Sequence, residues 1–75
     1  MLLEIQNNGK TMQQLGMING NYIVYYCNGL QEKVNDMFLF LKGLYSTLQL
    51  YQFIGCVKKH KTIRLNDGSY LVNVL

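Results

Sequence analysis

Few side chains in this sequence have the chemistry of a catalytic or metal-binding group. The chain contains one histidine, His60, and two cysteines, Cys27 and Cys56. Because Cys56 and His60 are four residues apart, these three side chains are candidate zinc ligands and include a candidate Cys–His couple. Structural zinc sites have four ligands and closely spaced cysteine pairs, and this sequence shows no fourth ligand. We therefore predict two free thiols, no disulfide, no metal and no cofactor.

The carboxylates do not form a candidate acid–base pair either. Glu32 and Asp36 are four residues apart, but they fall in the early turns of a predicted helix, where negative charge stabilises the helix dipole. The glycines are isolated and form no phosphate-binding loop of the Walker or dinucleotide type. We expect a protein that binds a partner, is not an enzyme and has no small-molecule substrate.

The positive charge of the chain is concentrated toward its C-terminal end. Lys58, Lys59, Lys61 and Arg64 fall within seven residues, in a chain of formal net charge +3. Such a segment attracts phosphate groups or an acidic protein surface, and it is equally typical of a strand edge that lysines protect from pairing. Four cations are few beside the roughly 6–10 phosphate contacts of a DNA-binding protein. Nucleic-acid binding through this segment is therefore the alternative hypothesis.

Three Asx-Gly pairs predict the turns of an antiparallel sheet, because these residues accept the positive φ angles of two-residue hairpin turns. The pairs are Asn8–Gly9, Asn19–Gly20 and Asp67–Gly68. They predict strands at about residues 1–6, 11–18 and 21–27 and a C-terminal hairpin at about residues 57–75. Two-residue turns also predict the partners across the strands, which are Ile5 with Met12, Leu15 with Val24, Ile63 with Val72 and Leu65 with Tyr70.

The most regular pattern predicts a helix between the two parts of the sheet. Apolar residues recur there at alternating spacings of four and three, as on one face of an α-helix. They are Leu30, Val34, Met37, Leu41, Leu44, Leu48 and Tyr51. Asn28 is a suitable N-cap, with Gln31 completing a capping box. We predict a helix over about residues 29–51, with its end between 49 and 53, although residues 48–57 also fit a strand.

These elements predict one α+β domain over residues 1–75, in which a small antiparallel sheet of order β-β-β-α-β-β packs against one amphipathic helix. That helix has apolar residues on more than the single stripe that one sheet covers, and uncovered apolar surface marks interaction sites. The simplest cover is a second copy of the chain, and the alternative is the C-terminal hairpin. The predicted homodimer or partner interface contains Phe38, Phe40, Gly43, Tyr45 and Thr47.

Composition completes the functional hypothesis. The chain has no Ala, Pro or Trp and is rich in Asn, Lys, Ile and Tyr, which suggests an AT-rich genome such as that of a phage or mobile element. Two cysteines are too few for a secreted disulfide framework, and no apolar run approaches the roughly 20 residues of a membrane span. We therefore expect a cytoplasmic, homodimeric, protein-binding module that binds and inhibits a host protein, with no membrane partner.

Overall fold

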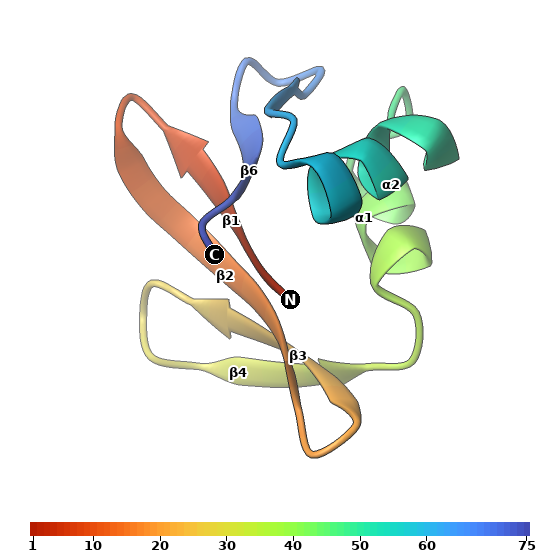
Figure 1. Cartoon of the computed structure of the whole chain (residues 1–75). Coiled ribbons are helices and arrows are strands. Elements are labelled where there is room, and N and C mark those ends of the chain that lie inside the picture. Colours follow the sequence, from red (N-terminus) through yellow and green to blue (C-terminus); the bar gives the residue numbers. More distant parts are fainter.

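Six strands form one antiparallel sheet, and two helices lie together on one of its faces (Figure 1). The computed structural model describes residues 1–75. In chain order the elements are β1 (Leu2–Asn7), β2 (Lys10–Ile18), β3 (Asn21–Tyr26), β4 (Gln31–Val34), α1 (Met37–Leu44), α2 (Leu50–Lys59), β5 (Ile63–Arg64) and β6 (Tyr70–Asn73). The strands lie in the order β4-β3-β2-β1-β6-β5. The predicted α+β class is confirmed, but the predicted order with one helix is wrong.

The first two hairpins turn where the Asn-Gly pairs predict. Asn8 and Asn19 have φ angles of 53° and 50°, and the glycine after each is also at positive φ. Leu15 lies opposite Val24 as predicted. Ile5 lies opposite Gln13, however, because the register shifts between Ile5 and Gln6. This β-bulge adds one residue to β2, so the predicted pairing of Ile5 with Met12 is wrong.

The predicted helix begins too early, because residues 31–34 form the edge strand β4 and pair with β3. Asn28 does not cap a helix, since its Oδ1 accepts from the Leu30 amide at 3.1 Å inside the β3–β4 turn. The N-cap is Asp36, whose Oδ1 accepts a hydrogen bond of 3.0 Å from the Leu39 amide. Residues 31–34, which were predicted to be helical, therefore belong to the sheet because they pair with β3.

The predicted helix also contains a break that the sequence pattern does not show. Lys42 Nζ donates to the backbone oxygens of Ser46 and Leu48, both at 2.7 Å, and so holds the chain between α1 and α2. The second helix begins after the N-cap Gln49 and ends at His60, whose φ of 55° is left-handed. Both proposals for residues 48–57 are therefore corrected, because this segment is neither the end of one long helix nor a strand.

The C-terminal hairpin exists but is shorter than predicted, since residues 57–59 belong to α2. Its register is also one residue away from the predicted one, with Ile63 opposite Leu71. The Leu65 amide donates to the Ser69 oxygen, so the loop holds three residues and not two. As a result Leu71 is buried and Tyr70 is exposed, and the predicted pairs with Val72 and Tyr70 are wrong.

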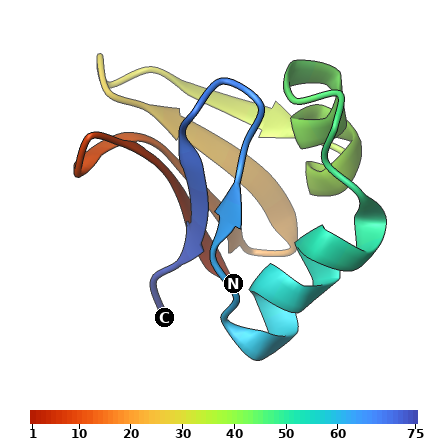
Figure 2. The same ribbon diagram turned by 90° about the horizontal axis from the view of Figure 1, so that it is seen from above.

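The core lies between the inner face of the sheet and the helices, which Figure 2 shows curving around that face. The strands contribute Leu3, Ile5, Leu15, Val24 and Leu71, and the loop after β5 contributes Leu65. The helices and the segment between them contribute Met37, Leu41, Tyr45, Leu48 and Cys56. Asn73 joins the two layers, because its Nδ2 donates to the Cys56 and Val57 oxygens at 3.0 Å.

The outer face of the sheet carries a polar network centred on Glu4. The Glu4 carboxylate accepts hydrogen bonds from Gln14, Gln6 and Thr11, at 2.8, 2.9 and 2.8 Å. These bonds stabilise the charged form and hold the pKa of Glu4 below its usual value of 4.5. The middle of this face is therefore satisfied without a covering layer.

The Glu4 network predicts a loss of stability in acid. Because the pKa of folded Glu4 lies below that of the unfolded chain, the network contributes fully above about pH 4.5 and is lost as pH falls through the folded pKa. Urea unfolding should show a larger decrease in unfolding free energy, between pH 7 and about pH 3, for the wild type than for Glu4→Gln. An equal decrease in both proteins contradicts this role, because the other carboxylates are common to both.

The contacts of Lys42 predict that it stabilises the break between the helices. Lys42→Met keeps the aliphatic stem and removes the donor to the Ser46 and Leu48 oxygens. We expect it to lower the unfolding free energy by about 1–2 kcal/mol, measured by urea denaturation. Lys59→Met, at the exposed end of α2, is the matched control, and an equal effect of the two changes would refute the assignment.

Candidate functional site

Large apolar side chains are exposed on the outside of the helical layer. Between 42 % and 74 % of each of these side chains is accessible to solvent. They are Leu39 on α1 and Leu50, Tyr51 and Ile54 on α2. We call this set the helical outer face. A surface helix normally presents polar residues on the side away from the core, so this surface is unusual for a protein that meets only water.

The spacing on α2 explains why these residues point outward. Cys56 is fully buried, and Phe53 and Val57 are half-buried against the core. Because a helix repeats every 3.6 residues, Tyr51 falls on the opposite side, and Leu50 and Ile54 lie in one row between the two sides. Lys58 continues their row by one more turn and is exposed, so a positive charge borders the apolar surface at the C-terminal end of α2.

The helices carry charge of one sign only. They contain Lys42, Lys58 and Lys59 and no carboxylate. Lys42 is engaged with backbone oxygens, whereas Lys58 and Lys59 are exposed in the last turn of α2. Asp36 adds a negative charge at the N-cap of α1, so the unpaired positive charge lies at the C-terminal end of α2. A partner with carboxylates beside an apolar centre would complement that end.

The interface residues predicted from the sequence differ in how far the structure buries them. Phe38 packs on Phe53 with ring centroids 5.7 Å apart and is half-buried. Tyr45 belongs to the core, and Phe40 is half-buried. Gly43 and Thr47 are exposed beside the helical outer face.

The exposed residue Tyr51 was assigned from the sequence to the buried face, because one helical phase was continued through the break. Treating residues 50–59 as a separate helix places Tyr51 on the outside. Leu44 shares the side of Met37 and Leu41 but is exposed at the end of α1. The signal that could have revealed the break is Gln49 with Gln52, which forms a capping box.

Gly43 has no structural reason to be glycine within one molecule. It lies inside α1, and a Cβ atom added to it would meet no other atom within 4 Å. Glycine inside a helix costs about 1 kcal/mol relative to alanine. An exposed glycine of this kind leaves room for the close approach of another molecule.

The predicted basic segment is spread over different surfaces. Lys58 and Lys59 end α2, and Lys61 follows the C-cap with its stem beside Gly55. Arg64 lies on β5 opposite Tyr70, on the outer side of the sheet. The four cations therefore do not lie along a single element.

The reactive side chains are also separated. Cys27 is exposed and Cys56 is buried, both are free thiols, and burial raises the pKa of Cys56. No group of three or more His, Cys, Asp or Glu residues is arranged to hold a metal ion. Neither helix is long and apolar enough to cross a membrane.

Comparison of the chain with protein-family models, with curated proteins and with solved structures finds no match.

Proposed function

We propose that this chain is a non-enzymatic protein-binding module and that the helical outer face is its docking surface. The observation that carries the proposal is the exposure of Leu39, Leu50, Tyr51 and Ile54 on adjoining helices. Burying apolar surface contributes about 25 cal/mol per Å², so covering this face provides the favourable free energy of binding.

The opposite side of the molecule supports this choice of surface. The outer face of the sheet places the Glu4 carboxylate and its three donors at its centre, where water solvates them. An antiparallel sheet with one solvated face is common in proteins. The helical outer face has no comparable polar network, and so it is the surface that gains most from a partner.

The charge of the helices favours a partner of particular chemistry. Two copies of the chain that meet through the C-terminal part of α2 would bring Lys58 and Lys59 of each copy together, which weakens association. An apolar surface of another protein, bordered by Asp and Glu, would avoid this repulsion. We therefore propose that the helical outer face binds an acidic surface of another protein. The homodimer expected from the sequence is the alternative. Origin in a phage or mobile element, and inhibition of a host protein, rest on composition alone.

The size of the molecule is compatible with such an interface. A standard protein–protein interface covers about 800 Å² on each partner. The accessible surface of this chain is 4875 Å², so one interface would occupy roughly a sixth of it. One side of the helical layer can supply that area, which leaves the sheet exposed.

Substitution of Ile54 tests the docking surface without knowledge of the natural partner. Peptides selected from a random library on the immobilised chain should combine apolar anchors with Asp or Glu. Ile54→Asp should weaken their binding by about tenfold or more, since it places a buried charge in the interface. Ile18→Asp is the matched control, because Ile18 is 48 % exposed and Ile54 is 42 % exposed. Basic peptides, or binding that Ile54→Asp leaves unchanged, would refute the proposal.

Light scattering on a sizing column distinguishes the two occupants. An acidic partner predicts a monomer of 8.7 kDa for the free chain. A homodimer would have twice this mass. If Ile54→Asp reduces that mass to the monomer value and Ile18→Asp does not, the helical outer face binds a second copy of the chain.

Gly43→Ala should move stability and binding in opposite directions. Because the added methyl group meets no atom within the molecule, we expect the unfolding free energy to rise by about 0.5–1 kcal/mol. The same methyl group would reduce the affinity for selected peptides, as measured by titration calorimetry. A gain in stability without a loss of affinity would place the contact away from Gly43.

A further inference from the structure

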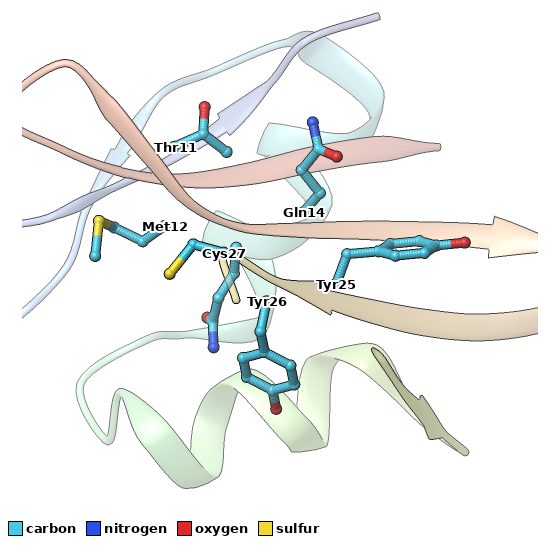
Figure 3. Close-up of a pocket in the computed structure, with 7 residues that line it drawn as sticks. Thr11, Met12, Gln14, Tyr25, Tyr26 and Cys27 are labelled. Atoms are coloured by element: carbon cyan, nitrogen blue, oxygen red, sulfur yellow. The ribbon is translucent and has the colours of Figure 1, made fainter. Parts of the chain in front are cut away.

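An open hollow of about 390 Å³ lies between the inner face of the sheet and the C-terminal end of α1. Its apolar lining includes Ile5, Tyr26 and Leu44. A smaller hollow of about 110 Å³ adjoins it and shares Gln13, Cys27 and two other residues (Figure 3). Figure 3 shows Tyr26 pointing from β3 toward α1, while Thr11 and Gln14 point to the other side of the strands. The volume of the larger hollow falls within the range of small-molecule sites.

The polar groups at the hollow include an acceptor without a donor and a carboxylate. Gln13 Oε1 is buried and has no hydrogen-bond donor. Gln13 lies on the inner side of β2, opposite Ile5 and Tyr26, where an apolar residue would be expected. A buried carbonyl oxygen without a donor is costly, so a ligand that brings a donor to Gln13 would gain free energy there.

A carboxylate stands at the same hollow. Asp67 Oδ1 accepts both bonds that Ser69 donates, from the amide and from the hydroxyl, which leaves Oδ2 without a partner in the molecule. Burial raises the pKa of the nearby Tyr45 hydroxyl, and the negative charge of Asp67 raises it further. No lysine or arginine lines the hollow. No cationic side chain of this protein therefore lies at the hollow beside Gln13 Oε1 and the Asp67 carboxylate.

We propose that this hollow binds a small organic ammonium compound. The apolar part of the ligand packs on Ile5, Tyr26 and Leu44, and its ammonium group donates to Gln13 and Asp67. Rotation about the terminal side-chain bonds of Gln13 turns its amide oxygen toward the ligand. The ligand is bound and not converted, and this site is separate from the helical outer face.

Three compounds of similar size test the proposal on the intact chain. Phenethylammonium should give saturable NMR shifts at the amides around the hollow, with an affinity about tenfold or more above those of 2-phenylethanol and phenylacetate. Saturation should also slow alkylation of the exposed Cys27, while the buried Cys56 stays unreactive as an internal reference. Absence of saturable shifts there, or equal affinity for the three compounds, would overturn the proposal.

Variants separate a specific site from a merely apolar depression. Asp67→Asn keeps an oxygen for Ser69 and should abolish the preference for phenethylammonium. Asp36→Ser removes an equal charge at the other end of α1, retains an N-cap oxygen, and should preserve the preference. If Asp67→Asn retains the preference, the proposed role of Asp67 is refuted.

Gln13→Leu provides a second readout that a purely structural glutamine would not show. Removing the oxygen that lacks a donor should raise the melting temperature by several degrees and weaken phenethylammonium binding severalfold. A lower melting temperature with unchanged affinity would contradict the proposal. Should this variant not fold, Asp67→Asn still decides the question.

Discussion

The width of the sheet is the constraint on which the rest of the molecule depends. Six strands about 4.8 Å apart span roughly 24 Å, whereas one helix with its side chains is about 10–12 Å wide. One helix therefore leaves part of the apolar face wet, and two adjoining helices cover it. A single straight helix over residues 29–51 would also be about 35 Å long, in a molecule that measures 26 × 24 × 24 Å. The break at residues 45–49 produces two shorter helices, which fit within the molecule and together cover the apolar face of the sheet.

Local signals in the sequence predicted the parts of the fold that depend on local chemistry. The Asn-Gly pairs predicted two hairpins, because the required positive φ angles belong to the turn itself. Met37 and Leu41 were correctly assigned to the buried side of a helix. Strand β4 and the bulge in β2 were missed because each depends on pairing with a neighbouring strand. Residues 31–34 show a helical spacing that only the contact with β3 overrides.

The sequence showed that the helical region has more apolar residues than one sheet can cover, but not which of them are exposed. The excess of apolar residues between 30 and 53 was visible in the sequence, and the structure exposes a subset of them. Which residues are exposed depends on the phase of each helix, and the spacing of four and three continues across the break by coincidence. Gln13 gave no signal at all, since a polar residue in a strand looks solvated until its neighbours are known.

The edge strand β4 has a consequence for growth of the sheet. In an antiparallel pair, residues opposite each other lie on the same face of the sheet. If β4 pairs with β4 of a second copy about a twofold axis, opposed residues must therefore be an even number of sequence positions apart. The two registers with the largest overlap place Glu32 against Glu32 or Lys33 against Lys33, and each repels. Glu32 and Lys33 thus disfavour edge-to-edge pairing of two copies through β4.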